Sequence, residues 1–233
     1  MSAVEFRNVT KQFGGRKVLD CLSFAIEQGE IFAIVGPSGT VKSVTLKHIA
    51  GLLEPDSGEV VCASRRIGYL FQSGALLAWL TVWENVALPL VETTRLGEKE
   101  IARRVDAALV AVGLADDAGK YPSEISGGMQ KRAGLARVLV RDAEIILYDE
   151  PTSGLDPVTS ASISRLIRDV GRSRGVTSVL VTHDLAGAFH IADRIMLLKD
   201  GKCVLCASPD GFSAARDPAV AEFLAAAKGE MPS

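Results

Sequence analysis

The spacing of apolar residues changes along the chain and separates strand-like from helix-like segments. Two β-like runs, VEFRNV and LSFAI, open the sequence, and residues 31–35 form an apolar run of buried-strand length that leads into a glycine-rich loop. Apolar residues then recur at helical spacing from Leu46 to Leu53, before Pro55 and Gly58. This order predicts a strand, a tight loop and a helix in the first part of the chain.

The remaining pattern divides the chain into an α/β core and a helical insertion. Two further strands, EVVCA and IGYLFQ, precede a stretch from about residue 73 to residue 140 that has helical periodicity and few strand signals. Strands return in EIILYD and TSVLVTHD, with a helical run at residues 160–170 between them, and an Ala-rich helix is expected from about residue 214, with a tail after residue 228. Alternating strands and helices are typical of a parallel sheet. We therefore predict one domain, with a core of residues 1–72 and 141–233 and a helical subdomain at residues 73–140.

The composition is that of a globular chain. Of its 233 residues, 48% are hydrophobic and 23% are charged, which excludes a disordered tail or a fibrous repeat. The net charge is −2 and the Lys and Arg residues are scattered, so no nucleic-acid partner is expected. No run approaches the roughly 20 apolar residues that cross a bilayer, and the N-terminus lacks a signal-peptide pattern. We expect a cytoplasmic chain.

The cysteines offer little chemistry. Four cysteines are too few for a disulfide framework in a chain of this length. Cys203 and Cys206 form a CxxC pair, but the pair lies in the strand-like segment KCVLCAS, and no second Cys or His pair has metal-ligand spacing. No metal or redox role is expected for them.

A candidate phosphate-binding loop, GPSGTVKS, follows the third strand and opens the first helix. Its successive backbone N–H groups and the helix N-terminus would form a positive concavity for a phosphate, Lys42 would add a point charge, and Ser43 would offer a hydroxyl to Mg²⁺. A glycine-rich turn of this kind also occurs as plain structure. The nucleotide-binding residues predicted here are Gly36, Pro37, Ser38, Gly39, Thr40, Val41, Lys42, Ser43 and Val44.

Two adjacent carboxylates, Asp149 and Glu150, end the apolar run IILYD. Parallel α/β sheets place their sites at the carboxyl ends of strands, where the first carboxylate suits Mg²⁺ and the second can polarise a water. Taken alone, such a pair is more often a solvated strand end. The position of this pair after the phosphate loop and before Asp156 and His183 favours its interpretation as a Mg²⁺ ligand and a water-polarising carboxylate.

The complete set of motifs resembles that of the ATP-binding-cassette (ABC) ATPases. The segment Ile125-Ser-Gly-Gly-Met-Gln130 is similar to the signature sequence of that family, and the phosphate loop, glutamine loop, signature, acidic strand, D-loop and switch histidine follow in the family's order from about residue 4 to residue 210. The resemblance implies an α/β fold, with a P-loop NTPase (RecA-like) core, a small antiparallel β subdomain and an inserted α-helical subdomain. It also implies ATP and Mg²⁺ as ligands.

Carried over by position, the resemblance assigns roles to single residues. Phe13 would stack on adenine, and Gln72 would reach Mg²⁺ and the attacking water. Glu150 would be the catalytic base, and His183 would contact the γ-phosphate. The Mg²⁺ ligands would be Ser43, Gln72 and Asp149. The alternatives are an ordinary half-buried aromatic residue for Phe13 and a structural strand-end histidine for His183. His48 and His190 do not lie in any of these motifs and are expected to be structural.

The signature implies a dimer. Ser126, Gly127, Gly128 and Met129 begin an amphipathic helix, so their N–H groups form a second phosphate-seeking helix start. In the family the signature of one subunit closes on ATP held by the other, with the D-loop residue Asp156 in the same interface. One set of motifs in one chain implies pairing with a second copy of itself.

Residues 68–90 are similar to the corresponding stretch of the ATPase of Mla-type phospholipid transporters, which work with MCE-domain proteins. The resemblance implies transmembrane permease subunits, MCE-domain proteins and accessory regulatory proteins as partners, and a peripheral location on the cytoplasmic face of the inner membrane. An importer-type ATPase for another cargo has similar residues here. A cassette of translation or DNA repair would favour two cassettes or a coiled-coil insertion, and the sequence has neither.

Val41 departs from the phosphate-loop pattern, which has Gly before Lys. A Cβ with two methyl groups is expected to collide with the β-phosphate or to open the loop. Strain of about 1–3 kcal/mol would weaken nucleotide binding about tenfold or more. The alternative function is therefore a structural or regulatory subunit with impaired nucleotide binding.

Overall fold

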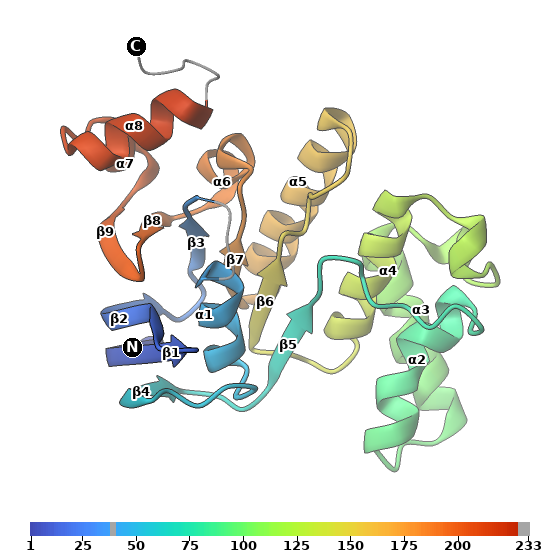
Figure 1. Cartoon of the computed structure of the whole chain (residues 1–233). Helices are drawn as coiled ribbons and strands as arrows, with labels where there is room; N and C mark the ends of the chain where they lie inside the picture. Colours follow the sequence, from blue (N-terminus) through green and yellow to red (C-terminus); the bar gives the residue numbers. More distant parts are fainter. Residues whose placement is uncertain (38–40, 228–233) are drawn as a thin grey trace.

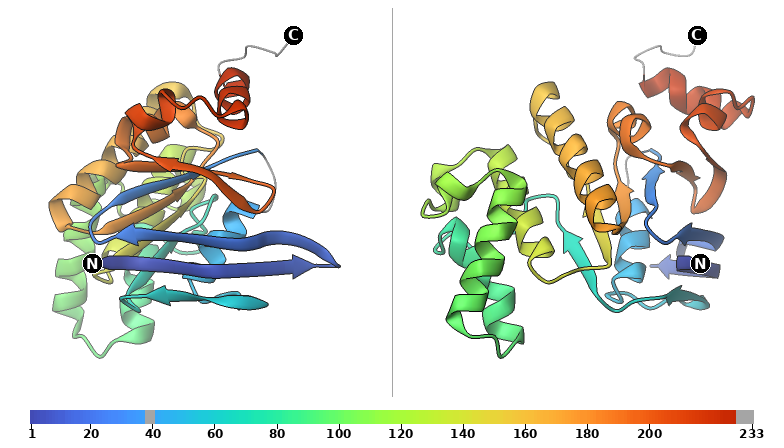
Figure 2. Two further views of the ribbon diagram at one scale, coloured as in Figure 1. Left: turned by 90° about the vertical axis from the view of Figure 1, so that its left-hand side faces the viewer. Right: turned by 180° about the vertical axis from the view of Figure 1, so that it is seen from behind.

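A small antiparallel sheet forms the first layer of the molecule. The computed structural model describes residues 1–37 and 41–227. Three strands pair in the order β2-β1-β4, with bounds β1 Ser2–Phe13, β2 Arg16–Glu27 and β4 Ser57–Cys62. Gly14 and Gly15 have positive φ angles and supply the two-residue turn between β1 and β2. The views in Figure 2 show this sheet as a layer of its own.

The larger sheet carries the candidate site. Its order is β5-β6-β7-β3-β8-β9, parallel except for the antiparallel edge strand β9. The bounds are β3 Ile31–Val35, β5 Ile67–Leu70, β6 Ile145–Asp149, β7 Thr177–Val181, β8 Arg194–Lys199 and β9 Lys202–Ala207.

Helices cover both faces of this sheet, so its central strands β7 and β3 are buried along their whole length. Successive side chains point to opposite faces: Phe32 and Ile34 pack in one core with α1 (Val41–Ile49) and the small sheet, whereas Ile31 and Val35 pack in the other core. The second core lies under α5 (Pro157–Arg174) and α6 (Leu185–Ile191), and α7 (Pro209–Ser213) and α8 (Pro218–Ala227) follow β9. Figure 1 shows α1 and α5 on opposite sides of β6.

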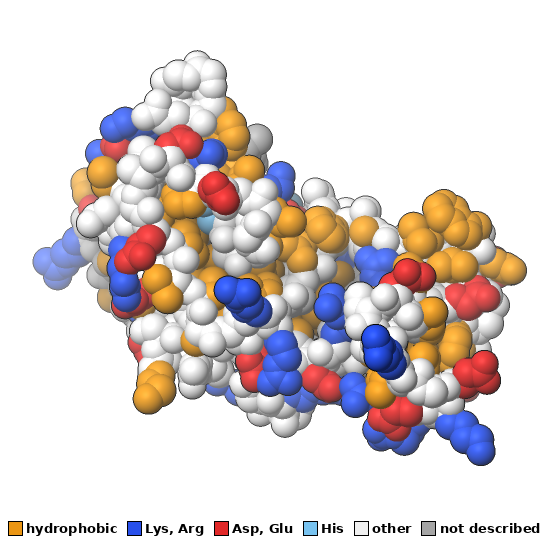
Figure 3. All heavy atoms as spheres, turned by 90° about the horizontal axis from the view of Figure 1, so that it is seen from below, with side chains coloured by type: hydrophobic (Ala, Val, Ile, Leu, Met, Phe, Trp, Pro, Cys, Tyr) orange, Lys and Arg blue, Asp and Glu red, His pale blue; other side chains and the backbone are white. Residues whose placement is uncertain are grey.

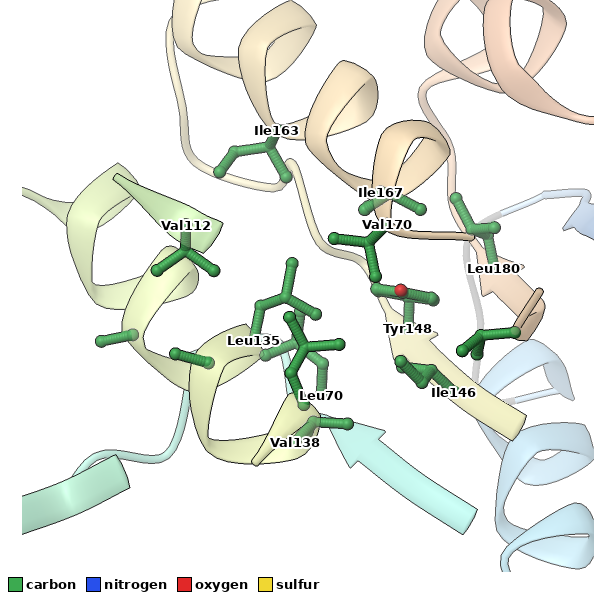
Figure 4. Close-up of a cluster of buried hydrophobic side chains, with 14 of the residues drawn as sticks. Leu70, Val112, Leu135, Val138, Ile146, Tyr148, Ile163, Ile167, Val170 and Leu180 are labelled. Atoms are coloured by element: carbon green, nitrogen blue, oxygen red, sulfur yellow. The ribbon is translucent and has the colours of Figure 1, made fainter. Parts of the chain in front are cut away.

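A helical region lies beyond β5 (Figure 1). It contains α2 (Val82–Thr93), α3 (Glu98–Val112) and α4 (Gly127–Leu139), with single 3-10 turns at Ala115–Asp117 and Pro122–Glu124. Thr81 caps α2 reciprocally with Glu84, which fixes where this helix begins. Leu135 and Val138 of α4 face Leu70 of β5 (Figure 4), so the helical region shares a core with the sheet. The exact division at residues 73 and 141 stays a prediction.

The element pattern differs from the sequence prediction in several places. β8, α6 and α7 were not predicted. The helices α6 and α7 have only 7 and 5 residues, and the apolar run Ile195–Leu198 of β8 is too short to separate a strand from a buried helical segment. β5 ends at Leu70, so Phe71 and Gln72 lie in the loop that follows and not in a strand. The predicted nucleotide-binding residues Ser38, Gly39 and Thr40 and the predicted tail after residue 228 lie outside the described residues. Among the described helices, none has the length and apolar character needed to span a bilayer.

Candidate nucleotide site

The candidate site lies at the carboxyl ends of β3, β6 and β7, which are neighbours in the sheet. Gly36 follows β3, Glu150 follows β6, and His183 lies just beyond β7. A Cβ atom on Gly36 would lie 2.2 Å from the carbonyl oxygen of Leu198, so only glycine allows β3 to enter the loop on this path. The sheet therefore brings together three motifs that are far apart in the sequence.

Lys42 points back into the phosphate loop. Its side chain is buried, and its Nζ donates hydrogen bonds of 3.0 Å to the carbonyl oxygens of both Gly36 and Pro37. Burial lowers the pKa of Lys42, and the negative charges of Glu150 and Asp149 oppose this shift. The result is a partly desolvated ammonium group at the position that the sequence predicted for a phosphate contact.

Asp149 accepts a hydrogen bond on each carboxylate oxygen. Ser43 Oγ donates to Oδ1 over 2.8 Å, and the hydroxyl of Tyr69 donates to Oδ2 over 2.9 Å. Burial, together with the hydrogen bond to Asp149, raises the pKa of Tyr69, so the hydroxyl keeps its proton and acts as the donor. Ser43 and Asp149, predicted together as metal ligands, are thus in direct contact.

Glu150 and His183 form a pair beside Asp149. The backbone of Glu150 has a φ of 50°, and its N–H donates to the carbonyl oxygen of Val181 over 2.9 Å, which turns the chain sharply at the end of β6. Glu150 Oε2 lies 2.7 Å from His183 Nδ1 and accepts a 3.3 Å hydrogen bond from the His183 backbone N–H. The carboxylate is largely buried and the imidazole is exposed, so the pair lies at the edge of the site.

Gln72 and Lys131 both contact the turn that follows Glu150. Gln72 Nε2 donates to Ser153 Oγ over 3.0 Å, and Lys131 Nζ donates to the carbonyl oxygens of Ser153 at 2.7 Å and Glu150 at 3.3 Å. Burial lowers the pKa of Lys131, which is 6% exposed. Gln72 therefore approaches the site through Ser153, and no hydrogen bond among the described residues joins it to Asp149 or Ser43.

The signature residues face α5 and not the phosphate loop. Ser126 caps α4 by accepting from the Met129 N–H over 3.3 Å, and Asp156 caps α5 by accepting from the N–H groups of Val158 and Thr159. Interaction with the Thr159 side chain is the leading cause that lowers the pKa of Asp156, followed by the hydrogen bond from the Thr159 backbone N–H. Within residues 1–37 and 41–227, no hydrogen bond joins Ser126, Gly127, Gly128 or Met129 to Lys42, Ser43 or Glu150.

A cavity of about 700 Å³ adjoins the phosphate loop. Phe13, which is 47% exposed, lines it, together with Val41, Lys42 and Lys199, and Lys11 Nζ lies 5.6 Å from the centre of the Phe13 ring. Arg16, Lys17 and Asp200 also line the cavity. The shape offers an aromatic face and several cations to a planar, anionic ligand.

Val41 and Val44 lie in the first turns of α1. Val41 lines this cavity and is also partly buried against the core shared with the small sheet. Val44 is 5% exposed and its side chain belongs to that core, so only its backbone is available to a ligand. The other histidines differ from each other: His48 is buried with Nδ1 2.8 Å from the Val44 carbonyl oxygen, whereas His190 lines a separate cavity with His183.

Three residues that make contacts in the site were not predicted from the sequence. Tyr69 was assigned to a strand and given no role, and Lys131 and Ser153 were not singled out. Signals existed for two of them. Tyr69 and Leu70 alternate on an edge strand, which points the hydroxyl toward the α1 face, and Lys131 is a charged residue within the apolar periodicity of α4.

Comparisons with known proteins agree with the geometry. A family model described as "ABC transporter" matches residues 19–153. The chain is 39% identical over 237 residues to the "Probable ribonucleotide transport ATP-binding protein mkl" of Mycobacterium tuberculosis (strain ATCC 25618 / H37Rv), over 95% of this chain and 66% of that protein. It thus spans about two thirds of the length of that relative. It is 38% identical over 245 residues to the "Intermembrane phospholipid transport system ATP-binding protein MlaF" of Escherichia coli (strain K12), over 98% of this chain and 91% of that protein.

A solved structure gives the same result for the fold. The ATP-binding cassette MJ0796, solved as a dimer in a post-hydrolysis state bound to ADP and Pi, superposes with a TM-score of 0.79 at 34% identity, over 88% of this chain and 98% of that chain. The predicted fold class is confirmed: an α/β P-loop cassette core with a small antiparallel sheet and several helices beside it.

The close contact between α4 and α5 gives a testable prediction. A Cβ atom on Gly128 would lie 2.5 Å from Thr159 Cγ2, so Gly128→Ala is expected to lower the free energy of unfolding by about 1–3 kcal/mol. Thr159→Ser removes that methyl group and keeps the hydroxyl. In the Thr159→Ser background the same Gly128→Ala change is expected to be neutral or stabilising by up to about 1 kcal/mol, since Ala favours a helix. Urea unfolding of the four chains measures this; equal effects in both backgrounds would contradict the contact.

Proposed function

Because the chain belongs to the ABC transporter ATP-binding family, we propose that it hydrolyses ATP to drive a membrane transporter, with lipid as the cargo. The observation that carries the proposal is the cluster at the carboxyl ends of β3 and β6. There Ser43 contacts Asp149, and Glu150 pairs with His183 directly beside them. At a solvated strand end, the two carboxylates would not be expected to be only partly exposed and both engaged in such contacts.

The residues fit Mg²⁺ and a nucleotide. Ser43 and Asp149 offer hydroxyl and carboxylate oxygens 2.8 Å apart, the oxygen donors that Mg²⁺ prefers. Lys42 and the N-terminus of α1 suit the phosphates, and Phe13 presents an exposed ring to the adenine. Gln72 would become a further Mg²⁺ ligand once its hydrogen bond to Ser153 is broken. Bound Mg²⁺ would neutralise phosphate charge.

Glu150 suits the role of general base. It is largely buried at the strand end, and its Oε2 is held by the His183 ring and backbone N–H. Oε2 would become available to a water proton once the ring contact is released. The exposed His183 side chain is free to turn toward a γ-phosphate, so we propose that ATP binding separates this pair.

A second copy of the chain would complete the site. Ser126, Gly127, Gly128 and Met129 begin α4 on the far side of β6 from the phosphate loop, as Figure 1 shows. Their N–H groups therefore suit a phosphate held by another chain better than one held in the same chain. The dimeric cassette with ADP and Pi supports this reading, and Asp156 at the start of α5 would lie in the same interface.

The loop before α2 suits a membrane partner. Asn85 is fully buried and bonds four backbone groups at residues 77, 80 and 81, which fixes a loop that leaves Trp79 72% exposed. A groove of about 360 Å³ between β5, α2 and α4 is lined by Phe71 and Pro89, together with the arginines Arg65, Arg66, Arg137 and Arg141. On the face seen in Figure 3, hydrophobic side chains also gather over the helical region. We assign this surface to a transmembrane permease subunit.

This assignment places the chain peripherally on the cytoplasmic face of the inner membrane. MCE-domain proteins and accessory regulatory proteins are proposed as further partners, because residues 68–90 resemble the Mla-type ATPases. The names of the relatives differ in cargo, since MlaF is named for phospholipid and mkl for ribonucleotide. Lipid is favoured because the match covers nearly all of MlaF. Mass spectrometry of lipids that co-purify with the intact complex tests the cargo.

The role of Glu150 gives the second prediction. Glu150→Gln removes the proton acceptor and keeps the size of the side chain. In a chain with a working phosphate loop, the parent or Val41→Gly, ATP hydrolysis by the intact complex is therefore expected to fall by a factor of about 100 or more, while ATP binding is retained. The variant is also expected to accumulate as an ATP-bound dimer in size-exclusion chromatography. Near-normal turnover would rule out Glu150 as the base.

The membrane contact gives the third prediction. Trp79→Asp and Leu77→Asp are expected to release the chain from membranes that contain its partner, because each places a charge in an apolar contact. Trp79→Asp should leave thermal unfolding unchanged, since this side chain is exposed. Val110→Asp, at a 66% exposed position on α3, is the matched control and should stay bound. Membrane retention of both Asp variants would place the interface elsewhere.

Val41 gives the fourth prediction. Val41→Gly is expected to raise the affinity for Mg-ATP about tenfold or more, because it removes the methyl groups that crowd the phosphate. It is also expected to cost about 1–2 kcal/mol of stability, because the partly buried side chain packs against the core. Val41→Ala keeps the Cβ and should fall between the two. Isothermal titration measures the affinities; equal values for the parent chain and Val41→Gly would show that the loop accommodates valine.

The same titration separates the two candidate functions. A parent chain that binds Mg-ATP and hydrolyses it within the complex is an active ATPase. A parent chain that binds it only after Val41→Gly would be a structural or regulatory subunit. The printed names of both relatives, each an ATP-binding protein, support the first.

A further inference from the structure

Tyr69 connects an edge strand to the carboxylate at the centre of the site. β5 is parallel to β6, and Tyr69 is in register with Leu147. Asp149 lies two residues further along β6 and therefore on the same face of the sheet as Leu147. This is also the face that α1 covers with Ser43. The Tyr69 hydroxyl thus reaches the carboxylate oxygen of Asp149 that Ser43 does not contact.

The two contacts fix the rotation of the Asp149 carboxylate. Oδ1 accepts from Ser43 and Oδ2 accepts from Tyr69, so a turn about the side-chain bond would break both hydrogen bonds. The Tyr69 ring is itself held. It packs against the core on the α1 side and stacks on Phe71, with ring centres 4.3 Å apart and planes inclined by 28°.

We propose that Tyr69 is a positioning residue that holds the Asp149 carboxylate in the orientation used for Mg²⁺, with Oδ1 kept on the Ser43 side. Tyr69 does not itself touch the metal. This inference rests on the proposed function, in which Asp149 and Ser43 bind Mg²⁺ together with a nucleotide. Its consequence is that the metal site is formed before the ligand arrives, so less ordering of Asp149 accompanies binding.

The size of the effect follows from the hydrogen bond. Without the hydroxyl, Oδ2 loses a partner inside the protein and the carboxylate gains a second orientation. The net free energy of one hydrogen bond in a protein corresponds to a change of about three- to tenfold in an equilibrium constant. Metal-dependent nucleotide binding should weaken by that factor, whereas binding without a metal should not change, because the hydroxyl contacts only the carboxylate among the described residues.

Mn²⁺ binding to the full-length chain tests the proposal. Free Mn²⁺ is followed by electron paramagnetic resonance during titration in the presence of saturating ADP, in the parent chain and in the Val41→Gly background. ADP affinity in EDTA is measured by isothermal titration. Tyr69→Phe removes only the hydroxyl and keeps the ring stack. Tyr121→Phe makes the same change at a 46% exposed position and is the matched control, and Asp149→Asn removes the carboxylate.

Tyr69→Phe should weaken Mn²⁺ binding about three- to tenfold, with unchanged ADP affinity in EDTA and a melting temperature lowered by no more than about 2–4 °C. Tyr121→Phe should match its background chain, and Asp149→Asn should lose more affinity than Tyr69→Phe. Unchanged Mn²⁺ affinity in Tyr69→Phe, with loss in Asp149→Asn, would overturn the role of Tyr69 and leave the proposed function intact. Unchanged affinity in Asp149→Asn, or no ADP binding even with Val41→Gly, would overturn both. If Tyr69→Phe lost ADP affinity in EDTA by the same factor as Mn²⁺ affinity, the positioning role of Tyr69 would also be overturned. A general loosening of the nucleotide site would then explain the weaker Mn²⁺ binding.

Discussion

The parallel pairing of β6, β7 and β3 is the constraint on which the rest of the site depends. These strands are adjacent in the sheet, and all of them run in one direction, so their carboxyl ends meet at one edge. The phosphate loop follows β3, Asp149 is the last residue of β6 with Glu150 directly after it, and His183 lies just beyond β7. A shift of one residue in either pairing would turn Asp149 to the wrong face and separate it from Ser43.

Packing on both sides of the sheet protects this pairing. The α1 side buries one set of alternating residues together with the small sheet, and the α5 side buries the other set together with the helical region. Tyr148, which is fully buried, lies between Ile167 of α5 and Leu180 of β7 in Figure 4, directly before the carboxylates. The residues that carry the chemistry are therefore fixed by two cores, while Trp79 and His183 remain exposed for partners and ligands.

The sequence was sufficient to predict the parts of the site that are local. Lys42, Ser43 and Asp149 lie in short motifs next to buried strands, where a strand, loop and helix order restricts the geometry. The contact of Tyr69 with Asp149 could not be predicted, because it depends on the register between β5 and β6. The charge of Lys131 within the apolar pattern of α4 indicates an unusual residue, but the sequence does not identify its partners, which are backbone carbonyl groups in the turn after β6. The roles assigned from the family resemblance stay predictions.

The most direct test of the account is a structure of the chain with Mg²⁺ and a non-hydrolysable ATP analogue. We predict a symmetric dimer in which each nucleotide lies between Lys42 of one copy and Ser126 of the other, with Mg²⁺ against Ser43 and Asp149. Glu150 should then be separated from the His183 ring. A nucleotide bound entirely within one chain, or a metal remote from Asp149, would contradict the account.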